Sequence, residues 1–376
     1  MSTSAGSDAG WVDQVTFTPL ANSAPVFTKE PAPLTVAAGG IAAFVSAADG
    51  PGNITYQWRR NAINLTGATS RIYFISSAVA ATHAGTYTCV ATNSNGSTTG
   101  IAAVFTVSAA DTNIASAVDA SSLLWVKSGN VPQWSRNTSP ANTHDNVDSA
   151  LATGLLPGAS TTIATNVIGP GYVSFWWRSD GTADEDVIGY NLDGLEANFI
   201  TSSGGWVQSQ NYVPLGLHTL SWTYYAGSAG SGPIGRGIVD QVAFTPTAYG
   251  TWQAAKFTAA QRLDARISGP AADPDGDGIA NLSEQFFGLA PLTLSIGALP
   301  KFASGGAGWS YTYQRDASAT TTVSKIEHST NLHSWNPVTP TESIISINGT
   351  VQTLQAILPP ETGPMHFYRF RLDLAE

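Results

Sequence analysis

The chain has 376 residues, and its 16 Lys and Arg against 26 Asp and Glu give a formal net charge of −10. Only 11% of the residues are charged and 43% are apolar, which is too apolar for a disordered chain and predicts a folded one. At about 100–200 residues per domain, the length predicts two to four domains. No cluster of Lys and Arg could neutralise a phosphate backbone, so we expect no nucleic acid partner. No run of 18 apolar residues is present, so we expect no membrane insertion.

A repeated segment marks the start of the chain. The sequence GWVDQVTFTP at residues 10–19 returns as GIVDQVAFTP at 237–246. Its alternation predicts a β-strand closed by proline. The second copy ends a long β-rich region, so residues 1–20 are interpreted as the terminal strand of a truncated module. We therefore expect the chain to begin inside a longer protein. The segment after Met1 lacks the features of a signal peptide, which places any export signal upstream.

Residues 25–108 contain short alternating stretches, with Trp58 followed by the Tyr87-Thr88-Cys89 segment. Strands of this length and a Trp before a Tyr-x-Cys predict a β-sandwich. The segment resembles an intermediate-type immunoglobulin domain, in which Trp58 would be the core tryptophan and Tyr87 the tyrosine corner. It departs from that pattern at Ser46, where the first cysteine would stand, and at His83, where an acidic residue would stand.

Cys89 is the chain's single cysteine. It excludes an internal disulfide and any zinc site built on cysteines. No basic residue in the sequence is placed to lower its pKa, so a reactive thiol is not expected. We expect Cys89 to be a buried thiol packed on Trp58.

Residues 113–247 are rich in alternating aromatic residues, as in the segments Val173–Arg178 and Thr219–Tyr224. This pattern predicts antiparallel strands with one buried face. The run Gly169-Pro170-Gly171 before Phe175-Trp176-Trp177, with the later Asp193-Gly194 and Gly205-Trp206, resembles the MAM-like jelly-roll modules of large bacterial exported proteins. The resemblance implies a jelly-roll fold for this region.

The last two regions differ in structure. Residues 248–292 are the only predicted helical segment, with a capping box at 258–261 and a short helix over 281–287 that ends at Gly288. Strands resume in residues 293–376, which we interpret as a C-terminal β-sandwich. The segment Ser329–Trp335 resembles a signature of small sandwiches that often close such proteins, with Asn331 in place of its aspartate.

The strongest chemical signal is the acidic loop that begins at Asp273. Counted from that residue, oxygen donors fall at positions 1, 3, 5, 7, 9 and 12, with glycine at position 6. This is the EF-hand spacing, which gives a hard cation six or seven oxygen ligands. The predicted calcium ligands are Asp273, Asp275, Asp277, the carbonyl of Ile279, Asn281 and Glu284.

The same loop resembles the calcium loops of dockerin and thrombospondin type-3 repeats. A single loop without a partner hand favours a structural clamp over a calcium sensor. The alternative is a solvated acidic turn. A possible second metal site comprises Asp145, Asp148 and Asp240, at places where MAM-like folds often hold a cation; for these residues the alternative is ordinary loop capping.

Carboxylates also gather in the loop that carries Asp180, Asp184, Glu185 and Asp186. Paired carboxylates are required for glycoside hydrolysis, which makes Asp184, Glu185 and Asp186 the candidate catalytic residues. The alternative is again a solvated turn. The sequence contains no nucleophile elbow, zinc-protease motif or Walker loop.

Exposed aromatic rings are the remaining candidates for ligand binding, because jelly rolls bind sugars through such rings. The candidates are Trp177, Trp206 and Tyr225. In an alternating strand Trp176 and Trp177 must point to opposite sides, so one of the two lies in the core. Alternatively, the outer ring packs under a loop or against a neighbouring domain.

Together these observations predict an all-β protein of tandem β-sandwich and jelly-roll domains with one short helical calcium-binding linker. We expect a monomeric, non-catalytic, extracellular or cell-surface region that binds a polysaccharide or a cell-surface partner, with calcium as its cofactor. The alternatives are a polysaccharide-active hydrolase or lyase that uses the acidic loop of the jelly roll, and a purely structural spacer.

Overall fold

The computed structural model describes residues 23–131, 133–181, 186–201, 204–227, 235–295, 299–305, 308–360 and 366–374. The predicted all-β fold class is confirmed, because strands form most of the described regular structure and the helices are short. The chain divides into two compact units. The first contains the described residues 23–34, 44–73 and 84–106, and the second contains residues 35–43, 74–83 and the described residues from 107 onward. Residues 1–20 lie outside the described residues.

The strands of the N-terminal region are short. They are β1 (Val26–Lys29), β2 (Leu34–Ala37), β3 (Ala42–Val45), β4 (Ala47–Asp49), β5 (Thr55–Arg60), β6 (Ile63–Asn64), β7 (Ile72–Ile75), β8 (Gly85–Asn93), β9 (Gly96–Thr99) and β10 (Ala103–Ser108), with helix α1 (Ala80–His83) before β8. The largest sheet has the order β2-β10-β8-β5-β6, and β9 pairs with β8. In it Trp58 lies opposite Cys89, and both are fully buried.

The region for which a jelly roll is expected follows, and we call residues 112–246 the jelly roll below. Its elements are α2 (Thr112–Ala117), β11 (Trp125–Gly129), β12 (Ser135–Asn137), the 3-10 helix η1 (Pro140–Asn142), β13 (Ser149–Thr153), β14 (Ser160–Asp180), β15 (Val187–Leu192), β16 (Leu195–Ile200), β17 (Val207–Tyr225) and β18 (Arg236–Pro246). The sheet order is β12-β13-β18-β14-β17-β15-β16, and β11 also pairs with β14.

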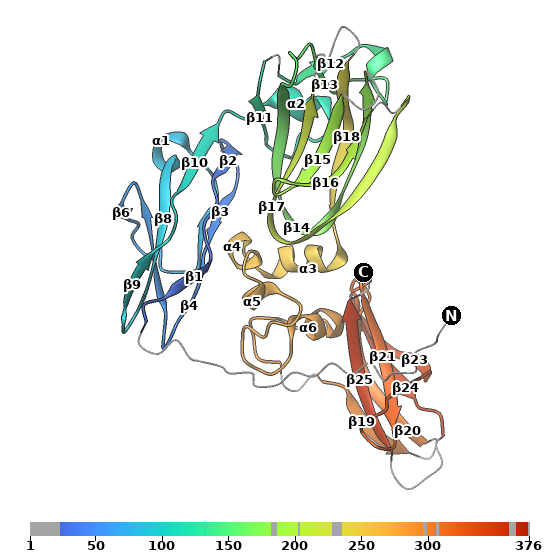
Figure 1. The fold of residues 1–376 in the computed structure, drawn as a ribbon. Coiled ribbons are helices and arrows are strands. Elements are labelled where there is room, and N and C mark those ends of the chain that lie inside the picture. The colour runs from blue at the N-terminus through green and yellow to red at the C-terminus, as the bar shows by residue number, and fades with distance from the viewer. Residues whose placement is uncertain are drawn as a thin grey trace, which may run out of the picture. The chain divides into compact units, whose positions relative to one another are not determined.

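Two long strands, β14 and β17, organise this sheet by running side by side through a bend (Figure 1). Before the bend β14 also pairs with β11, and after it with β18. The bend falls at Gly169, where a Cβ atom would overlap the carbonyl of Pro214. Because of the bend, the inward side chains of both halves meet in one core, where Phe175 packs edge-on against Trp222 at 5.1 Å between ring centroids.

Four short helices follow: α3 (Ala248–Lys256), α4 (Ala259–Arg262), α5 (Ala265–Ser268) and α6 (Asn281–Phe287). The predicted capping box is confirmed at Thr258 and Gln261, and Gly288 ends α6 in the left-handed conformation. The C-terminal strands are β19 (Lys301–Gly305), β20 (Gly308–Asp316), β21 (Thr322–Ser329), β22 (Asn336–Val338), β23 (Thr341–Asn348), β24 (Val351–Ile357) and β25 (Phe367–Leu374). They form the sheets β19-β20-β24-β23 and β22-β21-β25, and Phe286 and Phe287 of α6 belong to the core they share.

Candidate functional site

The acidic loop between α5 and α6 brings its three aspartates together. A carboxylate oxygen from each of Asp273, Asp275 and Asp277 lies within 4.8 Å of the others. The loop turns through Gly276 and Gly278, at φ values of +76° and +86° that favour glycine. Backbone amides of these two glycines donate to the carboxylate of Asp273 at 3.0 and 2.9 Å. The local sequence therefore fixes the carboxylates in one cluster.

Glu284 carries the most informative carboxylate of the loop. It is fully buried, and neither of its carboxylate oxygens has a hydrogen-bond partner among the described residues. Burial, followed by the charges of Asp275, Asp277 and Asp273, raises the pKa of Glu284 to about 7. Desolvating a charged group is costly unless an opposite charge compensates it. A cation would supply that charge.

Two more oxygens in this loop lack partners. Oδ2 of Asp275 and Oδ1 of Asn281 are buried and accept no hydrogen bond from the residues that the structure describes. The amide of Asn281 donates to the carbonyls of Ile267 and Gly269, both at 2.8 Å, which fixes that side chain. The buried Ile279 donates its backbone N–H to Asp277. The donor set, made only of oxygens, suits a hard cation such as calcium.

A second acidic cluster lies in the jelly roll. Carboxylate oxygens of Asp119, Asp145 and Asp240 lie within 4.8 Å of one another. Asp240 is fully buried, and its Oδ1 has no partner among the described residues. Burial is the largest cause that raises its pKa to about 6. Two of the three residues predicted for this metal site, Asp145 and Asp240, thus lie together. Asp119, which the sequence analysis did not select, completes the cluster.

Asp148, the third predicted residue of this site, has a different principal partner. Its Oδ2 accepts a hydrogen bond from Nε of Arg136 at 2.7 Å and forms an ion pair with the same guanidinium. Its Oδ1 is buried without a partner in the described part of the chain. The carboxylate also raises the pKa of Asp119, after burial and Asp145. Asp148 therefore borders the cluster without belonging to it.

Next to this cluster, aromatic rings gather on the outer side of β14. The imidazole of His144 stacks on the indole of Trp176, with centroids 3.9 Å apart and planes 16° apart. Trp206 meets the same imidazole edge-on at 5.5 Å. The guanidinium of Arg178 lies 5.5 Å from the centre of the Trp206 ring. All four side chains are partly exposed. We call His144, Trp176, Arg178 and Trp206 the ring cluster.

Polar contacts hold the ring cluster in place. Arg178 donates to the carbonyl of Ala141, to Oδ1 of Asn142 and to Oδ2 of Asp180. Asn142 is buried and also accepts a hydrogen bond from Arg236 at 2.7 Å. Arg178, at the edge of the ring cluster, is therefore held in one orientation, which lowers the entropy that ligand binding would cost at this side chain.

The same face continues along β14 and β17. Tyr172 and Tyr212, paired across the strands, are 37% and 52% exposed, with ring centroids 5.4 Å apart. Gln208 and Gln210 of β17 are exposed opposite Trp176 and Ser174. Aromatic and amide side chains thus alternate on a surface that faces solvent.

The prediction that Trp177 binds a ligand is wrong. Trp177 is fully buried and packs edge-on against Phe175, so its ring is not accessible to a ligand. As the alternation required, Trp176 points the other way. Val173, Phe175 and Trp177 share one apolar side of β14, whereas Ser174 and Arg178 share the side of Trp176. That difference was available in the sequence and identifies the outer ring.

The two other predicted aromatic residues lie on different parts of the sheet. Trp206 belongs to the ring cluster. Tyr225 is 43% exposed at the end of β17, where it pairs with Ser160 and Val187. The structure therefore does not place Tyr225 in the ring cluster.

The candidate catalytic carboxylates do not form a described active site. Asp184 and Glu185 lie outside the described residues. Asp186 is only 2% exposed, and its Oδ1 accepts the backbone N–H of Gly227 at 3.2 Å. The buried carboxylate of Asp186 connects the start of β15 with the end of β17, which does not favour the alternative in which Asp186 acts on a polymer. Asp180 is paired with Arg178.

The cysteine of the immunoglobulin-like region, Cys89, is free and fully buried. Burial raises the pKa of Cys89 to about 11. Ser46 is fully buried as well. The expectation of a buried thiol against Trp58, with a serine in place of its disulfide partner, is confirmed.

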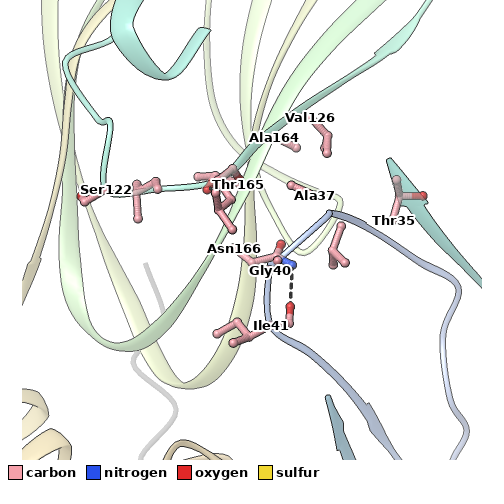
Figure 2. Close-up of a pocket in the computed structure, with 13 residues that line it drawn as sticks. Thr35, Ala37, Gly40, Ile41, Ser122, Val126, Ala164, Thr165 and Asn166 are labelled. Atoms are coloured by element: carbon pink, nitrogen blue, oxygen red, sulfur yellow. Dashed lines mark hydrogen bonds between the residues drawn. The ribbon is translucent and has the colours of Figure 1, made fainter. Parts of the chain in front are cut away.

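A pocket of about 200 Å³ lies in the second compact unit (Figure 2). Its lining consists of backbone and small or aliphatic side chains, among them Gly40, Leu124 and Ala164. The amide of Asn166 donates to the carbonyl of Ile41 at 3.4 Å across it. No titratable side chain lines the pocket within the described residues, so it offers no acid, base or nucleophile.

Comparison with known proteins identifies one region. Residues 28–108 match the family model described as an immunoglobulin domain. The chain therefore contains an immunoglobulin-like domain, as its resemblance predicted. No curated protein matches the chain in sequence. No helix among the described residues is long and apolar enough to cross a membrane.

Solved structures resemble separate parts of the chain. TmCBM61 in complex with beta-1,4-galactotriose is similar over 32% of this chain and 88% of its own, at 18% identity and a TM-score of 0.27. The secreted serine protease VesC from Vibrio cholerae is similar over 59% and 51%, at 10% identity and 0.32. Titin domain M7 is similar over 23% and 94%, at 24% identity and 0.21. Likenesses this distant carry no information about function.

Proposed function

We propose that this chain is a non-catalytic extracellular binding region, and that its jelly roll binds a polysaccharide on the outer face of β14 and β17. The ring cluster is the observation that carries this proposal. Trp176 lies on the outer side of β14, Trp206 lies just before β17, and the imidazole of His144 contacts both partly exposed indoles. Sugar rings present apolar C–H faces that pack on aromatic rings, and aromatic residues supply large contact areas at low entropic cost.

The polar side chains of this face suit the hydroxyl groups of a sugar. Gln208 and Gln210 are exposed and carry both donors and acceptors. Tyr172 lies four residues along β14 from Trp176, and Tyr212 pairs with Tyr172 from β17. A strand rises about 3.3 Å per residue. The face is therefore long enough for several sugar units, which favours a polymer over a single sugar.

Binding of a panel of soluble polysaccharides, measured by affinity electrophoresis and isothermal titration calorimetry, tests the proposal. We expect Trp176→Ala and Trp206→Ala to raise Kd at least tenfold for the polymer that binds. Tyr225→Ala is the matched control, because it removes an exposed ring from the same strand system outside the ring cluster, and it should leave Kd within twofold. Equal losses in all three variants, or no binding polymer in a broad panel, would reject the proposal.

We further propose that the loop 273–284 binds calcium as a structural ion. Support comes from Glu284, whose buried carboxylate accepts no hydrogen bond from the described residues and has its pKa raised by burial and by the charges of three aspartates. Asp273, Asp275, Asp277, Asn281, Glu284 and the carbonyl of Ile279 would hold the ion. Calorimetric titration of the chelator-treated chain should detect this site in the wild type, and Glu284→Gln should remove it. An unchanged titration in that variant would contradict the assignment.

A further inference from the structure

The acidic cluster of the jelly roll and the ring cluster share one short segment. His144 contributes its ring to the ring cluster, and the next residue, Asp145, contributes its carboxylate to the acidic cluster. The backbone N–H of His144 donates to Oδ2 of Asp240 at 2.7 Å. Nδ1 of its imidazole lies 2.8 Å from Oε1 of Gln241. The residue that stacks on Trp176 is therefore bonded to a carboxylate of the acidic cluster and to that carboxylate's neighbour.

The acidic cluster is built from three segments that are distant in sequence. Asp119 lies just after α2 at a φ of +57°, and the carbonyl of the preceding Val118 accepts the backbone N–H of Val242 at 2.8 Å. Asp240 is fully buried in β18, and Asp145 is partly buried in the loop after η1. Three carboxylates this close repel one another when ionised. Asp240 lies in a strand and Asp119 in the turn that closes α2, where the carbonyl of Val118 is bonded to β18, whereas Asp145 lies in the loop between η1 and β13. We expect repulsion to displace this 143–147 segment first.

The cluster also contains buried oxygens that point to a cation. Oδ1 of Asp240 has no partner among the described residues although the residue is fully buried. Oδ1 of Asp148, beside the cluster, is also buried without a hydrogen-bond partner among the described residues. A site made only of carboxylate oxygens favours a hard divalent ion, and calcium accepts such irregular oxygen sets.

We propose that a divalent cation held by Asp119, Asp145 and Asp240 fixes the imidazole of His144 on Trp176, so that ligand binding by the ring cluster requires the cation. The dependence on a ligand rests on the proposed function; the placement of the ring does not. His144 is here a positioning residue, which transmits occupancy of the cation site to the surface that contacts the sugar.

Proton NMR tests the placement of the ring without any polysaccharide. An imidazole stacked on an indole has its Cε1 proton shifted upfield, and His144→Gln assigns that signal. In the wild type we expect the shift in calcium and its loss in EDTA. Asp119→Asn should lose the shift in calcium as well, because Asn tolerates the same positive φ but carries no charge. The signal of His218, which is bonded to Asp193 elsewhere in the jelly roll, is the control and should not move.

Polysaccharide affinity tests the consequence for the ligand. We expect Asp119→Asn to raise Kd about tenfold in calcium, and Glu284→Gln, which alters only the other calcium site, to leave Kd within twofold. A His144 signal that is the same in calcium and EDTA would overturn the inference. A calcium-dependent His144 signal in a chain that binds no polysaccharide would reject the proposed function. It would still support control of the His144 ring by the cation. Binding that is equally tight in EDTA would reject the dependence on the cation.

Discussion

The backbone N–H of Ser295 donates to Oδ2 of Asp277 at 2.6 Å. Asp277 is a central residue of the acidic loop, and Ser295 lies where the chain leaves α6 for the C-terminal strands. On the other side of the loop, α6 places Phe286 in the core of the C-terminal sandwich. The loop is thus attached to the start of the C-terminal region at two points, and an ion that stiffens it would stabilise both.

Calcium removal should therefore destabilise the chain. A ligand that binds only the folded state contributes about 2.7 kcal/mol at one hundred times its Kd. We expect the melting temperature measured by calorimetry to fall when EDTA is added to the wild type. In Glu284→Gln this fall should be reduced. Glu196→Gln makes the same chemical change at an exposed position of β16 and should respond like the wild type. A full response in Glu284→Gln would contradict a structural ion in the loop.

Truncation of the two adjacent tryptophans of β14 should lower the free energy of unfolding by different amounts. Trp177→Ala leaves a large cavity in the jelly-roll core, which costs about 3–5 kcal/mol of unfolding free energy. Trp176→Ala removes a partly exposed ring, and such changes cost about 1 kcal/mol. Urea unfolding followed by circular dichroism measures both values. Similar losses from the two variants would contradict the assignment of Trp177 to the core and Trp176 to the surface.

Cys89 should react slowly in the folded chain. The thiolate is the reactive form, and burial raises the pKa of Cys89 from 9.0 to about 11. At pH 8 we expect alkylation by iodoacetamide to be far slower in buffer than in guanidinium chloride, as measured by mass spectrometry. Equal rates would show that the thiol is exposed.

The same raised pKa predicts how stability depends on pH. The folded state holds the thiol proton more tightly than the unfolded state, so the contribution of Cys89 is complete below pH 9. It is lost as the pH rises from 9 towards 11, by up to about 1.4 kcal/mol per pH unit. Cys89→Ala removes this term, so wild type and variant should differ in the slope of unfolding free energy against pH above 9. Parallel slopes would contradict the prediction.

Ser46→Cys should restore the disulfide that the immunoglobulin-like domain lacks. Ser46 and Cys89 are both fully buried, and Ser46 is close enough to affect the pKa of the Cys89 thiol. In the loop-entropy model, a disulfide between positions 46 and 89 raises the free energy of unfolding by about 4 kcal/mol. We expect denaturation in guanidinium chloride to move to higher concentration in the oxidised variant and to return on reduction. Free thiols that persist under oxidising conditions would contradict the geometry.

Short-range features of this protein could be predicted from the sequence, because their parts are neighbours in the chain. The acidic loop is twelve residues long, so its spacing alone brought Asp273, Asp275 and Asp277 together. The capping box at Thr258 and the end of α6 at Gly288 were likewise set by local hydrogen bonds and by glycine's access to positive φ. The immunoglobulin-like pattern of Trp58, Tyr87 and Cys89 was also sufficient to identify that domain.

Long-range features depended on the tertiary structure. Alternation separated Trp176 from Trp177 and placed Trp177 on the apolar side of β14, but the partners of that side depended on the bend of β14, which turns it towards Trp222. Asp119 joined the second acidic cluster because the chain at Val118 bonds to β18, a pairing that no local spacing encodes. The placement of His144 between carboxylates and indoles arose in the same way. Local spacing therefore determined the aspartate cluster of the loop 273–284, whereas sheet pairing across distant segments determined the ring cluster and the acidic cluster beside it.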